Sequence, residues 1–253
     1  FTIIIATYQR MTGPTYPKTA TVTLNNSELK FKLLRSYGDG DAEIKLRVPD
    51  KEIKGTVTFK RYKSFDGWTT AALKRQGEYL VTALPHQPPA GKIEYLISLG
   101  DAQKQVNVTP EPVILRFTGK VPAAVLIPHI LIMFLAMLFS SRTGMEAFIS
   151  GPKTYRYTLW TVILFFVGGF ILGPIVQYYA FGAWWSGWPL GEDLTDNKTL
   201  LALLVWLIAF FVLRKHPENR KWPMMASVFM VMVYLIPHSV KGSEIDHTKM
   251  SKI

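Results

Sequence analysis

Two histidines and three acidic residues carry the side chains best suited to binding a metal or a cofactor. His129 and His238 each follow a proline and lie within or beside an apolar run. Ionisable groups are expensive to bury in such runs, which makes them candidate site residues. Imidazole suits both haem iron and first-row metals, and nearby carboxylates favour a divalent metal over haem b. The acids stand in the stretch FGAWWSGWPLGEDLTDNK and are Glu192, Asp193 and Asp196.

Whether the two histidines meet depends on where the helix that holds His129 begins. With a start near Pro122, His129 lies about 10 Å below the outer surface, at 1.5 Å per residue, while His238 lies near the interface. With a start at Pro128, which proline's preference for the first helical turn favours, both histidines lie at the same depth. Two interpretations stay open: the pair binds a haem b or a metal, or both are helix-end residues.

The same stretch also has residues typical of a membrane interface. Its three tryptophans suit the headgroup zone, because an apolar ring with one N–H donor is well placed there. Several glycines and Pro189 disfavour regular helix, so we expect the loop to fold back over the helix ends. Asp196 or Thr195 is expected to cap a helix that begins near Lys198. The membrane-interface residues are Trp184, Trp185 and Trp188.

Four long runs without Asp, Glu, Lys or Arg must position these residues. Three of the runs are long enough to cross a hydrocarbon core of roughly 30 Å as helices. The run at 199–213 is shorter and reaches about 22 Å. The chain opens FTIIIATYQR, which we interpret as the tail of a helix, with a cleaved signal peptide as the weaker alternative. We expect a remnant of a span at 1–15 and four spans at about 122–141, 157–181, 198–214 and 222–240.

The second span has a pattern typical of helix packing. Gly169 and Gly173 form a small-x-x-x-small pair, which permits close approach of another helix. Pro174 is expected to kink the same helix. These three residues are therefore assigned to packing, whereas no residue is assigned to catalysis.

Charge predicts which side of the membrane each loop faces. The connections after the first and third spans are rich in Lys and Arg, whereas the Trp-rich loop has only Lys198. The positive-inside rule places the basic loops in the cytoplasm and the Trp-rich loop outside. The N-terminal region and a polar tail at 242–253 are then outside as well. We expect an integral protein of a bacterial-type inner (cytoplasmic) membrane with its N-terminal domain in the periplasm.

Residues 16–119 have the pattern of a β domain. Eight short segments rich in β-branched and aromatic residues are separated by turn signals, which predicts a two-sheet sandwich. The run GEYLVTALPHQPPAGKIEYLISL resembles the late hairpin of fibronectin-type-III or immunoglobulin-like modules. The resemblance implies a module that binds or spaces. The predicted fold is thus a two-part membrane protein, with an all-β sandwich (Ig/FN3-like) ectodomain at 16–119 and an α-helical transmembrane bundle at 120–241.

Composition excludes several classes of function. The chain has no cysteine, so it has no disulfide, no thiolate-ligated iron–sulfur cluster and no cysteine nucleophile. Its net charge of +11 fits loop topology and lipid headgroups, and no basic-aromatic motif indicates nucleic acid. No Walker loop, HExxH or GxSxG motif is present.

These features lead to one hypothesis and two alternatives. The leading hypothesis is a non-catalytic, cofactor-free membrane subunit that anchors the Ig-like module within a larger complex, with lipids and other membrane subunits as partners. The first alternative is an electron-transfer subunit that binds haem b or a metal at the outer face through His129 and His238, with help from the three acids. The second is a small transporter or a lipid-handling enzyme, with the acids as an acid/base pair.

Overall fold

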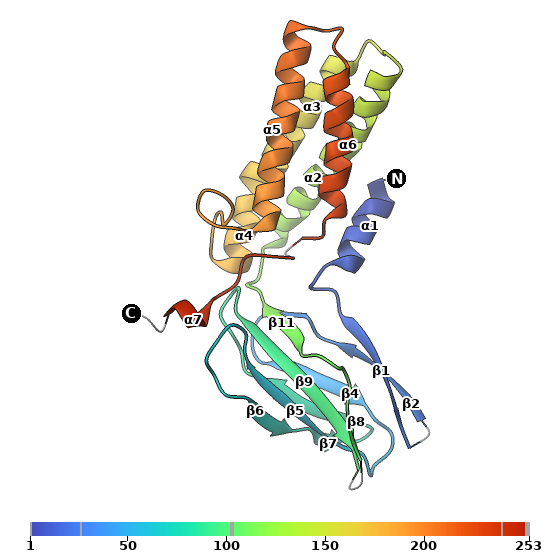
Figure 1. Ribbon diagram of the computed structural model, residues 1–253, viewed down its shortest axis with the longest axis vertical. Coiled ribbons are helices and arrows are strands. Elements are labelled where there is room, and N and C mark those ends of the chain that lie inside the picture. The colour runs from blue at the N-terminus through green and yellow to red at the C-terminus, as the bar shows by residue number, and fades with distance from the viewer. Residues whose placement is uncertain (1, 26, 102–103, 239, 251–253) are drawn as a thin grey trace. The chain divides into compact units, whose positions relative to one another are not determined.

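The computed structural model describes residues 2–25, 27–101, 104–238 and 240–250 (Figure 1). The chain divides into two compact units. The helical unit comprises Phe1–Pro14 and Val121–Ser243, and the β unit comprises Thr15–Lys120 and Glu244–Ile253. The predicted order of a β-rich N-terminal part and a helical C-terminal part is confirmed. The segment from Glu244 belongs to the β unit, whereas the sequence predicted a separate tail from residue 242.

A strand lies in each of the eight segments that the sequence predicted. The structure also contains strands of two or three residues that the sequence did not indicate. Segments this short are missed because they have no recognisable alternation of apolar and polar residues. The described strands are β1 (Lys18–Leu24), β2 (Ser27–Leu33), β3 (Ser36–Tyr37), β4 (Ala42–Arg47), β5 (Lys54–Arg61), β6 (Thr69–Ala72), β7 (Lys74–Gln76), β8 (Tyr79–Leu84), β9 (Lys92–Gly100), β10 (Gln105–Asn107) and β11 (Val113–Phe117).

The strands form three sheets. One has the order β3-β11-β9-β5-β6, with β10 also paired to β9, and a second has the order β4-β8-β7. β1 and β2 form a separate hairpin. All pairs are antiparallel except β3 with β11, which is parallel. Burial alternates along β4, as expected for a strand with one face against a core.

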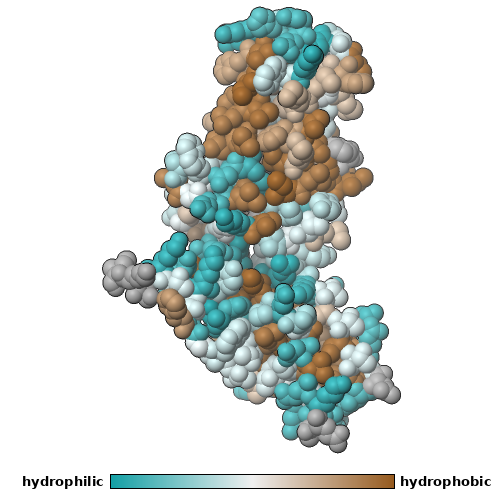
Figure 2. Space-filling model, in the orientation of Figure 1, coloured by the Kyte–Doolittle hydropathy of each residue, from teal (hydrophilic) through white to brown (hydrophobic). Residues whose placement is uncertain are grey.

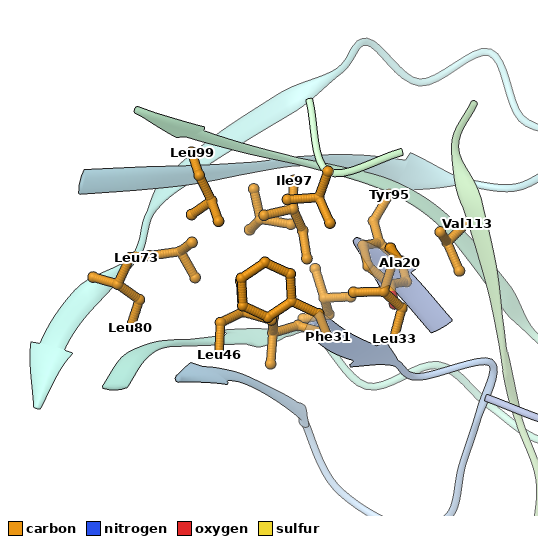
Figure 3. Close-up of a cluster of buried hydrophobic side chains, with 14 of the residues drawn as sticks. Ala20, Phe31, Leu33, Leu46, Leu73, Leu80, Tyr95, Ile97, Leu99 and Val113 are labelled. Carbon is orange, nitrogen blue, oxygen red and sulfur yellow. The ribbon is translucent and has the colours of Figure 1, made fainter. Parts of the chain in front are cut away.

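Side chains from all three sheets meet in one hydrophobic core. Figure 3 shows Phe31 of the hairpin among leucines of the other strands, including Leu46, Leu80 and Leu99. Tyr95 of β9 is fully buried, and its hydroxyl donates to the backbone oxygen of Leu34 at 2.8 Å. This bond satisfies the one polar atom of a large buried ring. The β unit therefore has a core of its own.

Within its described residues, the helical unit contains three helices long and apolar enough to cross a membrane. They are α2 (Ala123–Phe148), the continuous helix Thr154–Phe181, and α5 (Leu194–Lys215). The second of these consists of α3 (Thr154–Phe166), a π-helical turn η1 (Val167–Leu172) and α4 (Gly173–Phe181). α6 (Lys221–Leu235) is shorter, and α1 (Thr2–Thr12) and α7 (His247–Met250) complete the described helices. The prediction of a helical membrane-type part is confirmed at this level.

The helix ends differ from those predicted for physical reasons. α2 begins at Ala123 with Pro128 inside it, so a start at Pro128 is wrong and His129 lies in the second turn. α5 has 22 residues because Asp193 caps it well before the expected start near Lys198. α6 has 15 residues and stops before Ile236, which precedes a proline and has extended backbone. The third apolar helix is thus longer than predicted and the last is shorter.

The helices pack as a bundle in which α2 and α5 each contact α3 and α6 (Figure 1). Trp206 of α5 is fully buried at its centre. Thr143 of α2 and Thr161 of α3 are also buried, and their hydroxyl oxygens lie 3.2 Å apart. Both hydroxyls also bond the carbonyl four residues earlier, which leaves these small polar residues satisfied between helices.

Candidate functional site

A small pocket of about 130 Å³ lies within the helical unit at the end that carries the Trp-rich loop. It is bounded by α2, the turn η1, α4, the start of α5 and the segment after α6. Both candidate histidines line it, as do two of the three candidate acids. The lining residues are His129, Met133, Gly169, Gly173, Pro174, Val176, Gln177, Ala180, Phe181, Asp193, Thr195, Asp196, Thr199, His238 and Ser243.

His129 is fixed by a backbone carbonyl. Its Nδ1 lies 3.0 Å from the oxygen of Gly168. A carbonyl oxygen only accepts hydrogen bonds, so Nδ1 carries the proton and Nε2 presents a lone pair. The same oxygen accepts the N–H of Gly173, as a π-helical turn requires. Pro174 has no N–H to donate to the ladder, and π turns before such breaks often occur at functional sites.

His238 reaches the pocket from the segment after α6. The residue is exposed, and it lines the pocket together with His129. Lys198 is buried, and its ammonium donates to the carbonyl of Ile236, the residue that ends α6. A cation at the carboxyl end of a helix is stabilised by the helix dipole. The structure therefore brings the two predicted histidines to one pocket, although α2 begins at Ala123, a start from which the sequence predicted different depths for them.

Asp193 is committed to the local backbone. Its Oδ1 accepts the N–H of Thr195 at 2.7 Å and caps α5, a role that the sequence assigned to Asp196 or Thr195. Its Oδ2 accepts the hydroxyl of Ser243 at 2.6 Å. Gly242 leaves the space for this contact, because a Cβ there would lie 2.5 Å from the Cα of Asp193. The carboxylate thus joins the start of α5 to the segment that follows α6.

Asp196 ties the Trp-rich loop to the bundle. Its Oδ2 accepts the backbone N–H of Ser186 at 2.7 Å and the side-chain amide of Gln177 at 3.0 Å. The Gln177 amide also donates to the hydroxyl of Ser186 at 2.6 Å. Gln177 thereby finds the partners that an amide in an apolar helix requires. Asp196 is buried and surrounded by donors, so it acts as a structural acceptor.

Glu192 lies outside the pocket. Its side chain is exposed and pairs with Lys241 at 3.1 Å. Across residues 2–25, 27–101, 104–238 and 240–250, no group of three or more His, Asp or Glu side chains is positioned to hold a metal ion. The three acids and two histidines of the sequence hypothesis therefore do not form one cluster.

The tryptophans build an aromatic surface on the loop. Trp184 stacks on Tyr178 with ring centroids 4.5 Å apart, and Trp185 stacks on Phe170 at 5.7 Å. The indole N–H of Trp185 donates to the carbonyl of Trp188. Trp184 and Trp188 are largely exposed. Rings held in this way suit the headgroup zone predicted for them.

The two glycines predicted to pack against other helices have different neighbours. A Cβ on Gly169 would lie 3.0 Å from Thr199 of α5, so this glycine permits a close approach of two helices. A Cβ on Gly173 would meet no neighbour closer than 3.4 Å. The sequence missed Gly144, whose Cβ would lie 2.5 Å from the hydroxyl of Ser227 where α2 meets α6. The sequence signal for this contact was a glycine in one apolar run and a serine in another, because small residues are common where membrane helices approach closely.

An ion-pair cluster in the β unit holds the segment that begins at Glu244. The Glu244 carboxylate pairs with the ammonium groups of Lys63 and Lys92. Burial opposes its ionisation, but the two lysines outweigh burial and lower the pKa of Glu244. Burial and Arg116 lower the pKa of Lys92 more than Glu244 raises it. Ile245 adds a backbone hydrogen bond to the oxygen of Ala90.

No family model, curated protein or solved structure matches this chain. Its function is therefore argued from its own residues. These residues form a β unit with its own core, helices of membrane length, and a pocket lined by two histidines.

Proposed function

We propose that this chain is an integral membrane subunit whose four-span helical bundle anchors an Ig-like module on the extracytoplasmic side. The subunit is non-catalytic and works within a larger membrane complex. Asp193 and Asp196, the pair available for acid/base chemistry, are both engaged in structural hydrogen bonds. This occupancy favours an anchor over the alternative of a lipid-handling enzyme.

The strand order supports an Ig-like identity for the β unit. Ig domains have strands B, E and D in one sheet and C, F and G in the other, with C′ added beside C in variable-type domains. The sheet β4-β8-β7 corresponds to B-E-D, and β11-β9-β5-β6 corresponds to G-F-C-C′. The hairpin of β1 and β2 is an addition to that pattern. Modules of this type usually bind or space other proteins.

The observation that carries the four-span topology is the return of the chain to the β unit. Glu244 pairs with Lys63 and Lys92, so the chain after α6 lies on the same side of the membrane as the β domain. The chain must therefore cross the membrane an even number of times between Lys120 and Glu244, because both residues lie on the same side. Three helices are long enough to cross, so α6 provides the fourth crossing. Its 15 residues reach about 22 Å, and a bilayer accommodates a short span by local thinning.

Charge and surface composition support the orientation and the partners. The loops α2–α3 and α5–α6 carry the basic residues that favour the cytoplasm, which places the β unit and the Trp-rich loop outside. Figure 2 shows a hydrophobic band over the middle of the helical unit. The apolar helices also have exposed large side chains, such as Leu131, Leu204 and Phe211. A groove of about 960 Å³ between α2 and α6 offers a further apolar surface to a partner subunit in the membrane.

The topology is tested by labelling single cysteines, since the natural chain has none. In intact cells, an impermeant maleimide is expected to label Lys45→Cys, Leu190→Cys and Lys249→Cys. Lys153→Cys and Glu218→Cys should react only after the membrane is permeabilised. All five positions are exposed, so accessibility within the fold is matched. Labelling of Lys45→Cys and Lys249→Cys from opposite sides would refute the four-span topology.

The subunit role is tested by the native mass of the gently solubilised protein. We expect a complex that contains reproducible partner proteins in fixed ratio. A chain that migrates as a monomer in every mild detergent contradicts a role within a larger complex. The labelling experiment is independent of this result, because topology does not require a partner.

A second function, electron transfer at the outer face, is favoured by one observation. His129 and His238 line the same pocket. Its volume of about 130 Å³ is well below the roughly 300–1,000 Å³ of usual cofactor and small-molecule sites. This volume favours a single metal ion over haem b. An absorption spectrum with a Soret band in the purified protein would contradict this choice.

A further inference from the structure

We propose that the pocket is a copper(I) site whose ligands are His129 Nε2, the imidazole of His238 and the thioether of Met133. This inference rests on the second function proposed above and names its metal and its third ligand. Neither the three predicted acids nor a haem is part of the proposed copper site.

His129 and Met133 are held side by side. They lie four residues apart on α2, so their side chains share one face of the helix. Both contact Gly168 in the π-helical turn: Nδ1 of His129 bonds its carbonyl, and a Cβ on Gly168 would lie 2.7 Å from Sδ of Met133. The absence of a side chain at Gly168 is what lets the sulfur reach this position. The turn therefore holds both side chains against Gly168, and both residues line the pocket.

The hydrogen bond of His129 is the one that a metal ligand requires. Metal-binding histidines usually donate their second ring N–H to a carbonyl or a carboxylate, which fixes the ring and the tautomer. The Gly168 carbonyl takes this role and leaves the Nε2 lone pair without a hydrogen-bond partner within the described part of the chain. A neutral imidazole with a fixed orientation is thus available to a metal.

His238 completes the set and provides access. It lines the same pocket as His129 and Met133. Its exposed side chain gives an ion a route from solvent, which a buried metal site must have. A ligand contributed by the segment after α6 would also link metal binding to the position of that segment.

The donor set selects the metal. Thioether sulfur is a soft ligand that favours copper(I), and imidazole accepts copper as well. Hard cations prefer carboxylates, but Asp193 and Asp196 already accept hydrogen bonds from the loop and the helix start. The pocket of about 130 Å³ has space for one ion and a few waters, each of which occupies roughly 30 Å³ in the liquid.

The test is copper(I) binding by the full chain in detergent, measured anaerobically by competition with a chromogenic copper(I) chelator. We expect one ion per chain. Met133→Leu, His129→Ala and His238→Ala should each weaken binding by at least the roughly 10–100-fold that loss of an outer-shell partner costs. Matched controls are Met137→Leu, in the buried core one turn further along α2, and exposed His216→Ala. Both controls should bind like the natural chain.

Three results would overturn the inference. The first is no stoichiometric binding, and the second is binding that survives Met133→Leu and His129→Ala at the affinity of the controls. The third is tighter binding of zinc(II) than of copper(I), which would contradict the soft donor set. X-ray absorption on the copper-loaded protein tests directly whether the Met133 sulfur binds copper. A Cu–S signal should disappear in Met133→Leu and persist in Met137→Leu.

Failure of the inference can be distinguished from failure of the second function. A Soret band that disappears in His129→Ala would preserve electron transfer and overturn the copper site. A protein that binds neither copper nor haem would refute both. The four-span anchor is judged separately, by cysteine labelling.

Discussion

Replacement of Glu244 by glutamine should release the C-terminal segment from the β unit. The carboxylate is mostly shielded from solvent and sits between Lys92, also mostly shielded, and the more exposed Lys63. A hydrogen bond to a charged group contributes about 1.5–3 kcal/mol, and an exposed ion pair about 0–1 kcal/mol. The expected loss for the segment is therefore about 2–4 kcal/mol, of which the pair with Lys92 provides most.

This loss is measurable by hydrogen exchange of the full chain. The amide of Ile245 donates to the carbonyl of Ala90, so it reports directly on docking of the segment. Since 1.4 kcal/mol is a factor of ten, its exchange should accelerate by about 30-fold to 700-fold in Glu244→Gln. Glu192→Gln is the matched control, because Glu192 forms an exposed pair with Lys241 in the helical unit. An unchanged Ile245 exchange rate in Glu244→Gln would refute the reasoning.

The same contact predicts a dependence on pH. The pKa of Glu244 is lower in the folded chain than its ordinary value of 4.5, because the two lysines outweigh burial. A carboxyl group with a depressed pKa stabilises the fold fully above the ordinary value, and this contribution is lost as the pH falls through the lowered pKa. After correction for the intrinsic rate, protection of Ile245 should be constant near neutral pH and decrease below about 4.5. In Glu244→Gln this acid-dependent decrease should be absent.

Three further changes test other contacts. Asp193→Ala removes the cap of α5 and should cost about 0.5–2 kcal/mol, measured as faster exchange of the Thr195 amide. Gly144→Ala places a Cβ 2.5 Å from the Ser227 hydroxyl and should cost about 1–3 kcal/mol by thermal unfolding, whereas Gly67→Ala enters open space and serves as control. The carboxyl of Asp66, whose pKa hydrogen bonds from Arg61 lower to about 2, should remain ionised at pH 3.5 in a carboxyl NMR titration.

The β unit was largely predictable because its strands have local signals. Alternation of apolar and polar residues marks β4 and β9, and Gly- or Asp-rich turns separate the strands. The sheet order was not readable, since the parallel pairing of β3 with β11 joins residues far apart in the sequence. Docking of Glu244 was missed for the same reason. A polar residue near the end of a chain has no local pattern that indicates a partner such as Lys63.

The helix ends were predicted less well because, in the sequence, buried polar residues near a helix end look like loop residues. Asp196 and Lys198 broke the apolar run, so the sequence placed the start of α5 too late. In the structure both are buried, and each has hydrogen-bond partners outside its own helix: Asp196 in the Trp-rich loop and Lys198 at Ile236. Polar residues near a membrane end can thus belong to a helix when tertiary partners satisfy them.

In the candidate site, too, residues with a local sequence signal were predicted, whereas a residue whose role depends on tertiary packing was not. The two Pro–His pairs identified His129 and His238, because an ionisable residue beside an apolar run is conspicuous in any sequence. Met133 was not identified, since a methionine in an apolar helix is usually core. Its role emerges from the π-helical turn, where Pro174 lacks an N–H and Gly168 presents both a carbonyl and an open face. That turn depends on how η1 packs against α2, which no local pattern contains.

The anchor and the pocket are linked by the segment between α6 and the β unit. The carbonyl of Ile236 accepts a hydrogen bond from Lys198, His238 lines the pocket, and the hydroxyl of Ser243 donates to Asp193. Three described residues of this segment therefore contact the bundle. The next residue, Glu244, is fixed to the β unit. An ion bound by His238 would therefore stabilise a segment whose two ends are held by different units. The amide of Leu194 donates to the carbonyl of Lys241, so copper loading should slow hydrogen exchange at Leu194. In His238→Ala, addition of copper should leave the exchange rate of Leu194 unchanged. Equal exchange with and without copper would mean that the ion, if bound, contributes nothing to the position of the segment.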